Sequence, residues 1–153
     1  MLPDLALLIL LRHGNYKALY QIDIRGEVSN EDLALFFESF AGERTDTFAL
    51  RLVDGAWRER ALIDSVLADT LEHWSIGRLS RVDHNILRIA VYELLRMDDI
   101  PARVTIDEAI ELAKTYGDQN SGRFVNGVLD QVADRLKLKD KGEERTHAKA
   151  HGP

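Results

Sequence analysis

The stretch from Arg78 to Ala133 constrains the fold of this 153-residue chain most strongly, because it has the pattern of three consecutive amphipathic helices with clear stops. The first of these helices has apolar residues at helical spacing on two of its sides, which predicts a position at the centre of a helical bundle. These residues are Val82, Ile86, Leu87, Ile89, Ala90, Val91, Leu94 and Leu95. Pro101 then forces a stop, because proline has no N–H and biases Ile100 away from helical geometry.

Capping signals predict the limits of the next two helices. Thr105 and Glu108 have the spacing of a capping box, and Gly117 suits the left-handed position that ends a helix. Asn120 or Ser121 is expected to cap the last helix. The predicted inward residues are Ile106, Ala109, Ile110 and Ala113, then Phe124 or Val125, Val128, Leu129, Val132 and Leu136. Gly127 inside the last helix costs about 1 kcal/mol relative to alanine, which a close helix crossing would explain.

Strand signals are nearly absent from the whole chain, so the predicted fold class is all-α. Helices are expected over about residues 4–23, closed by Gly26, from the cap-like Ser29 through Phe40, and over 47–74 with a break near Gly55. Core-like spacing in the last of these regions falls on Leu62, Ile63, Val66, Leu67, Ala68 or Asp69, and Leu71. We therefore predict a single domain over residues 1–138 with a subdomain boundary near 75–80, followed by a disordered charged tail over 139–153.

The composition is that of a globular protein with a formal charge of −6, so any nucleic-acid site must be a local basic patch. No cysteine is present, which excludes disulfides and thiolate zinc sites and fits a reducing cytoplasm. The apolar run Leu5–Leu11 is too short to span a bilayer. Asp4 precedes the run and Arg12 follows it, unlike a signal peptide, so a buried helical turn and no membrane association are expected.

The residues that could carry catalysis or hold a metal do not form a recognisable site. Glu108 and Glu111 lie opposite the apolar stripe of their helix, which predicts a solvated face. The histidines are dispersed, and the one pair at helical metal-site spacing, His147 and His151, lies in the tail. No nucleophile elbow or phosphate-binding loop occurs. We expect no enzyme activity, no metal and no cofactor, and we expect Glu93 to be a buried structural carboxylate paired with an arginine or a helix N-terminus.

The opening of the last helix is the best candidate for a ligand site. Free N–H groups and the helix dipole favour a phosphate there, Arg123 adds positive charge, and Phe124 offers a ring for an unstacked base. The alternative is an ordinary capped terminus with Phe124 in the core, and the residues alone favour this alternative.

Several motifs in a fixed order resemble the family of the transcription antitermination factor NusB, from about Lys17 to Leu138. They are KALYQIDIRG at 17–26, LEHWSIGRLSRVDHNILRIAVYELL at 71–95, DIPARVTIDEAIELAKTYG at 99–117 and NSGRFVNGVLD at 120–130. The resemblance implies an N-terminal three-helix half packed on a C-terminal helical half, and no catalysis. It also implies a complex with ribosomal protein NusE that binds boxA RNA of nascent ribosomal transcripts and helps RNA polymerase, indirectly, to resist termination.

Matching positions in the family imply two surfaces on this chain. The RNA surface would include Arg12, Lys17, Gln119, Asn120, Ser121, Arg123 and Phe124, and the partner surface would include Arg78, Arg81 and Asp83. The family usually has an arginine-rich N-terminus, whereas only Arg12 and Lys17 are basic here, and each lost phosphate contact weakens RNA binding. We therefore expect either weakened RNA binding or a start that is not the native one.

Two other functions compete with this interpretation. One is a homodimeric helical scaffold that buries its N-terminal apolar run against a second copy, with RNA binding secondary. The other is an accessory domain, because NusB-like domains also precede some RNA cytosine methyltransferases; this chain has no room for the methyltransferase domain itself.

Overall fold

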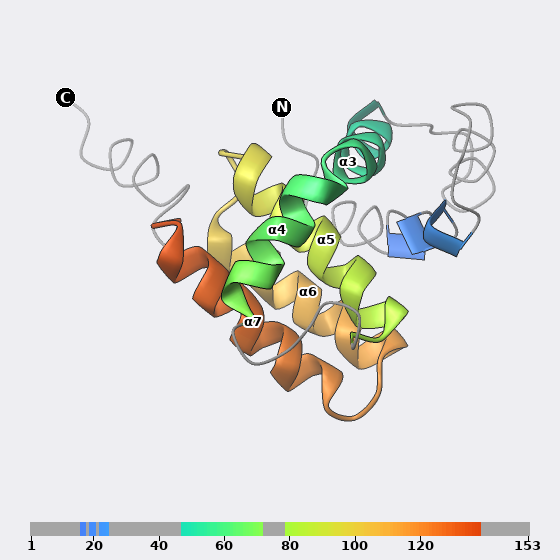
Figure 1. The fold of residues 1–153 in the computed structure, drawn as a ribbon, viewed down its shortest axis with the longest axis vertical. Helices are drawn as coiled ribbons and strands as arrows, with labels where there is room; N and C mark the ends of the chain where they lie inside the picture. Colours follow the sequence, from blue (N-terminus) through green and yellow to red (C-terminus); the bar gives the residue numbers. More distant parts are fainter. Residues whose placement is uncertain (1–15, 18, 21, 25–46, 72–78, 139–153) are drawn as a thin grey trace.

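The computed structural model describes residues 16–17, 19–20, 22–24, 47–71 and 79–138, and in these ranges the chain is helical without any strand (Figure 1). Five helices are α3 (Thr47–Arg58), α4 (Arg60–Thr70), α5 (Arg81–Arg96), α6 (Ala102–Tyr116) and α7 (Ser121–Arg135). The described residues between 16 and 24 are also helical, and we call them the first-helix segment. The all-α prediction is confirmed.

Helix α5 lies at the centre of the bundle and contacts α3, α4, α6 and α7. The two-sided apolar pattern explains this position, because Ile86, Leu87, Ile89, Val91 and Leu94 are all buried. Ser80 caps the helix, and its hydroxyl accepts a hydrogen bond from the Asp83 N–H at 3.0 Å. The prediction of a central helix is confirmed.

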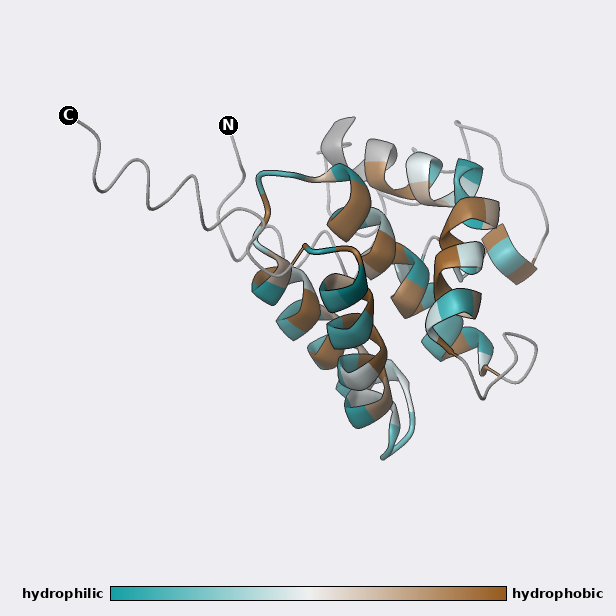
Figure 2. Cartoon of the chain, turned by 60° about the vertical axis from the view of Figure 1, so that its left-hand side comes forward, coloured by the Kyte–Doolittle hydropathy of each residue, from teal (hydrophilic) through white to brown (hydrophobic). Residues whose placement is uncertain are grey.

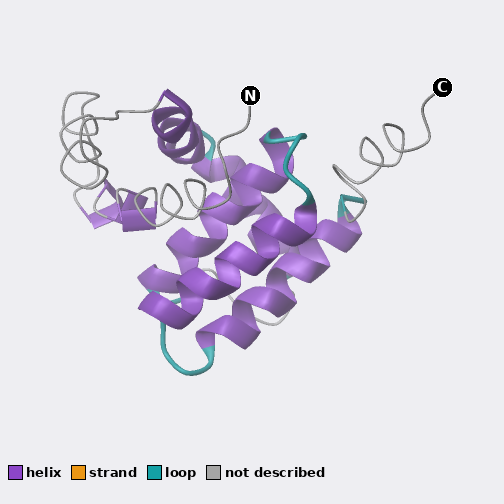
Figure 3. Ribbon diagram, turned by 180° about the vertical axis from the view of Figure 1, so that it is seen from behind, coloured by secondary structure: helices purple, strands orange, loops and turns teal. Residues whose placement is uncertain are grey.

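Helices α6 and α7 form an antiparallel pair that packs along its whole length, as Figure 3 shows from behind. Helix α6 begins earlier than predicted, because the carbonyl of Pro101 accepts hydrogen bonds from Val104 and Thr105. Thr105 is therefore buried inside the helix rather than capping it, and the capping-box prediction is wrong. Gly117 has an extended backbone (φ −91°, ψ −168°), so the left-handed ending is also wrong.

The core consists of apolar side chains from every described helix, and Figure 2 shows hydrophobic (brown) and hydrophilic (teal) residues alternating along the helices. The predicted inward faces need corrections in α4, α6 and α7. Leu112 is buried in α6, while Ile106 and Ile110 are only partly buried. Leu62 and Leu136 are exposed, at 46% and 39%. Gly127 is exposed and a Cβ there would meet nothing within 4 Å, so no helix crosses it in the described structure.

The break in the helical region after Thr47 falls at Glu59, between α3 and α4, rather than at Gly55, which lies inside α3. Ile63, Leu67 and Leu71 of that region are buried as predicted. The predictions for residues 1–15, the second helix, most of the subdomain boundary near 75–80 and the 139–153 tail lie outside the described residues. No helix in the described ranges combines the length and apolarity that a membrane span requires.

Candidate nucleic-acid interface

Residues 117–120 form a tight turn between α6 and α7 that is held by its own polar groups. The Asp118 carboxylate accepts a hydrogen bond from the Asn120 N–H at 2.7 Å, and the Asp118 N–H donates to the Ser121 hydroxyl at 3.0 Å. Asn120 occupies the cap position of α7 but makes no side-chain cap bond, and Ser121 is buried. The turn is therefore fixed from within, and the side chains of Gln119 and Asn120 are exposed.

Arg123 and Phe124 follow in the first turn of α7. Arg123 is exposed, and no hydrogen bond or ion pair from it occurs within the described structure. Phe124 is partly buried against the core, while Val125 is fully buried and takes the inward position. A helix N-terminus with a nearby guanidinium attracts an anion such as a phosphate.

Lys17 of the first-helix segment lies beside this turn. Its ammonium is 5.5 Å from the centre of the Tyr116 ring, and Tyr116 is the last residue of α6. Tyr16 packs on the same ring with a centroid distance of 4.8 Å. Burial, together with Tyr20, Tyr116 and Asp83, raises the pKa of Tyr16 to about 12, so this side chain stays a neutral phenol at physiological pH.

The structure thus brings Lys17 to the end of α6 that leads into the turn. Arg12 lies outside the described residues. Tyr116 was not predicted as a site residue, although an aromatic residue directly before Gly117 was a signal that could have identified it. We call Lys17, Tyr116, Gln119, Asn120, Arg123 and Phe124 the turn surface.

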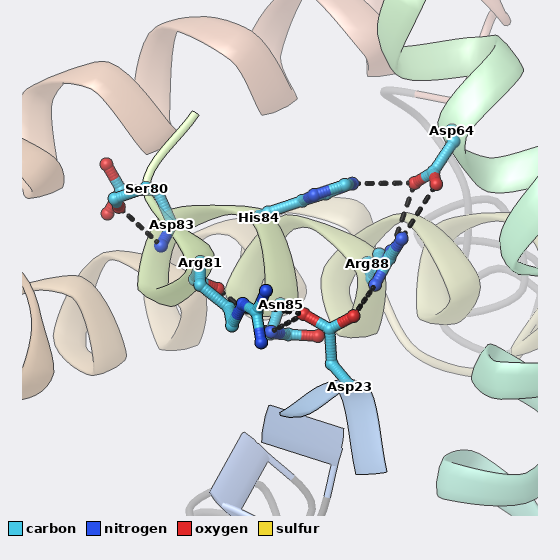
Figure 4. A network of polar contacts seen from close by, with 8 residues as sticks. All are labelled: Asp23, Asp64, Ser80, Arg81, Asp83, His84, Asn85 and Arg88. Atoms are coloured by element: carbon cyan, nitrogen blue, oxygen red, sulfur yellow. Dashed lines mark hydrogen bonds and ion pairs between the residues drawn. The ribbon is translucent and has the colours of Figure 1, made fainter. Parts of the chain in front are cut away.

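A second polar cluster joins α5 to α4 and to the first-helix segment (Figure 4). Arg88 donates to Asp64 from Nε at 3.0 Å and from Nη2 at 2.8 Å, and His84 Nε2 lies 2.7 Å from Asp64 Oδ1. Burial alone would raise the pKa of Asp64, but the hydrogen bonds from His84 and Arg88 prevail and lower it to about 2. Asp64 is therefore a carboxylate at every physiological pH.

Asp23 receives the other contacts of this cluster. Its carboxylate accepts a hydrogen bond from Asn85 Nδ2 at 3.1 Å and lies 3.4 Å from Arg88 Nη1 and 3.5 Å from Arg81 Nε. Burial alone would lower the pKa of Arg88, but Asp64 and Asp23 raise it, which keeps the guanidinium charged. Two carboxylates from different elements therefore share one buried arginine of the central helix.

A profile described as the NusB family matches residues 11–134. The chain belongs to the NusB family. It is 46% identical over 125 residues to a transcription antitermination protein NusB of Bacillus cereus, covering 82% of this chain and 95% of that protein. Solved structures that resemble this NusB-family chain include T. maritima NusB, with 46% identity, a TM-score of 0.70 and coverage of 81% of this chain and 88% of that one.

A second solved structure contains a complex. It is described as the antitermination factors NusB and NusE in complex with dsRNA, and its matching chain is 30% identical with a TM-score of 0.77. The match covers 86% of this chain and 99% of that chain.

The residues expected on the partner surface of this NusB-family chain differ in their accessibility. Arg81 is exposed and lies next to Asp23, whereas Asp83 is nine-tenths buried. One oxygen of Asp83 has no hydrogen-bond partner in the described part of the chain. Arg78 lies outside that part. Contact of these residues with a partner stays a prediction, and Arg81 is its accessible member.

The carboxylates that were considered for metal binding do not form a metal site in the described ranges. In the described ranges no group of three or more histidine, aspartate or glutamate side chains could hold a metal ion. Glu111 is exposed and pairs with Lys114 at 3.5 Å, which fits the predicted solvated face. Glu93 is buried, as expected of a structural carboxylate, and its pairing with an arginine or a helix N-terminus stays a prediction.

We expect Asp64→Asn to lower the free energy of unfolding by about 2 kcal/mol at neutral pH, because the folded pKa is about 2 against an ordinary value of 3.8. A lowered pKa contributes stability above the ordinary value, and this contribution is lost as the pH falls toward 2. The deficit of the variant should therefore shrink between about pH 4 and pH 2, as measured by urea unfolding. A loss of unfolding free energy that is equally large at neutral pH and at about pH 2 would contradict the prediction.

Asp54→Asn is the matched control, because Asp54 also pairs with an arginine, Arg58, but on an exposed surface. Exposed pairs contribute less than about 1 kcal/mol, so this variant should unfold like the wild-type protein at both pH values.

Proposed function

We propose that this chain is a transcription antitermination factor that binds boxA-type RNA together with ribosomal protein NusE, and so acts on RNA polymerase indirectly. The observation that carries the proposal is its likeness, over nearly the full length of the matching chain, to the NusB of a NusB–NusE–dsRNA complex. We further propose that it acts in the cytoplasm as a binding protein without catalytic activity.

The turn surface supplies the chemistry for RNA. Arg123 and the N-terminus of α7 suit a phosphate, and Lys17 adds a second cation from another part of the chain. Phe124 is only partly buried, and an aromatic side chain that is accessible at a helix opening suits stacking with an unstacked base. This arrangement supports the RNA role over that of an ordinary capped terminus.

The net charge of −6 indicates that RNA binding depends on a partner. The turn surface has two described cations, Lys17 and Arg123, in a chain whose net charge is −6, so the non-specific electrostatic contribution is small and the chain alone should bind RNA weakly. NusE is expected to raise the RNA affinity, and RNA must then raise the NusE affinity by the same factor. The exposed Arg81 at the start of α5 is our candidate for the partner contact.

The test is a titration of boxA RNA and a scrambled RNA of the same composition, with and without NusE. We expect preference for boxA, higher affinity with NusE, and a loss of affinity in Arg123→Ala without a change in thermal midpoint, because Arg123 is exposed. Arg103→Ala is the control, since Arg103 is an exposed arginine in the first turn of α6, at the end of that helix away from the turn.

Equal affinities for the two RNAs in every condition would refute the proposal. Equal effects of Arg123→Ala and Arg103→Ala would remove Arg123 from the site. Light scattering on the same samples tests the homodimer, which would be favoured by a stable dimer that persists with RNA and NusE.

A further inference from the structure

The first-helix segment is held against the bundle by two kinds of contact. Leu19 and Ile22 are buried in the core, and Tyr16 packs on Tyr116. Apolar contacts of this kind hold the segment against the bundle. They specify its rotation about its own axis only loosely, because they are not directional. A polar contact with fixed geometry can set that rotation.

Asp23 makes such a contact at the other end of the segment. Asn85 donates one hydrogen bond to this carboxylate, and Arg81 and Arg88 form ion pairs with it. These three residues come from one face of α5 at intervals of four and three residues, so they line up along the central helix. Figure 4 shows the carboxylate of Asp23 pointing up into this row from the first-helix segment. The Asp23 carboxylate can reach Arg81, Asn85 and Arg88 only when the segment has one particular rotation about its axis and one particular position along α5.

The same rotation decides where Lys17 lies. Lys17 and Asp23 are six positions apart, which is about 9 Å along a helix. Both belong to helical parts of the first-helix segment, so a rotation or a shift of one of them moves the other. In the structure this places the Lys17 ammonium 5.5 Å from the Tyr116 ring centre, at the end of α6 that enters the turn.

We propose that Asp23 is a positioning residue for RNA binding, which holds the first-helix segment in the register that places Lys17 on the turn surface. This inference rests on the proposed function. Asp23 touches no RNA in this account and acts through Lys17.

The experiment measures boxA RNA affinity and its salt dependence for the full chain with NusE, in wild type, Asp23→Asn, Lys17→Gln and the double variant. We expect Asp23→Asn to weaken binding about threefold and to flatten the salt slope by up to about 0.7, the value of one single-strand phosphate contact. In the Lys17→Gln background Asp23→Asn should have no further effect, because the residue through which it acts has lost its charge.

Asp64→Asn is the matched control. Asp64 shares Arg88 with Asp23 but lies on α4, so its loss should reduce stability and leave the RNA affinity and salt slope unchanged. Asp23→Glu keeps the negative charge on a longer side chain. It should cause a smaller loss of RNA affinity than Asp23→Asn, and this loss should also disappear in the Lys17→Gln background. It replaces Asp23→Asn in the comparison if that variant does not fold.

Additive effects of Asp23 and Lys17, or an equal loss of RNA affinity in Asp64→Asn, would overturn the positioning role and make Asp23 merely structural. In both cases the wild-type protein would still prefer boxA, and the proposed function would stand. Absence of boxA binding by the wild-type protein with NusE would overturn both proposals.

Discussion

Arg88→Met is expected to lower the free energy of unfolding by about 3–5 kcal/mol, the largest effect of any single change that we expect in this chain. Arg88 is buried and binds two carboxylates, Asp64 at 2.8 Å and Asp23 at 3.4 Å. Methionine fills a similar volume, but it leaves both partly buried carboxylates without their shared cation. Urea unfolding at pH 7 measures the loss.

A triple variant separates the cost of unpaired charge from the cost of altered packing. Arg88→Met combined with Asp64→Asn and Asp23→Asn removes the buried guanidinium and both of its carboxylates, and it leaves His84 and the exposed Arg81 in place. Replacing a complete buried ion cluster is often neutral or stabilising, so the triple variant should recover most of the loss. A triple variant as unstable as Arg88→Met alone would show that the guanidinium acts through packing.

Alanine at Gly117 and at Gly127 should have opposite effects on stability. A Cβ at Gly117 would lie 2.4 Å from the Ser121 side chain and 2.8 Å from the Ala113 carbonyl oxygen, so the backbone must move at a cost of about 1–3 kcal/mol. A Cβ at Gly127 meets nothing within 4 Å, and alanine there should stabilise the helix by about 1 kcal/mol. Thermal and urea unfolding should show a lower free energy of unfolding for Gly117→Ala and a higher one for Gly127→Ala.

The two glycine variants should also differ in function. Ser121 accepts the hydrogen bond that closes the turn, so its displacement in Gly117→Ala should move Asn120 and Arg123 and weaken boxA binding about tenfold. Gly127→Ala should bind RNA as the wild-type protein does. If both variants gain stability, the crowding at Gly117 does not govern the turn.

The sequence predicted the core of this fold well where the apolar pattern was unambiguous. Helix α5 was identified because it is apolar on two sides, and Val128, Leu129 and Val132 because they recur on one side of α7. The predictions failed where two local signals competed. Pro101 starts α6 ahead of the capping box at Thr105, and Gly117 is needed for space rather than for a left-handed backbone.

The candidate site was predictable only in part, for a physical reason. The turn and the opening of α7 are contiguous in sequence, so helix-terminus chemistry pointed to Arg123 and Phe124. Tyr116, Asp23 and Arg88 act through contacts between distant segments, such as the 62-residue separation of Asn85 and Asp23. The signal that was overlooked is Arg88 itself, a charged residue on the most buried helix, where an ion partner is required.

The placement of Lys17 against Tyr116 has a consequence for the newly made protein. The first-helix segment is synthesised before α6 and α7, which pair locally with each other. The turn surface therefore forms only after α7 has been synthesised and all three elements have packed together. A chain that lacks α6 and α7 has Lys17 but neither Tyr116 nor Arg123, so under the proposed function it should not compete with the folded domain for RNA.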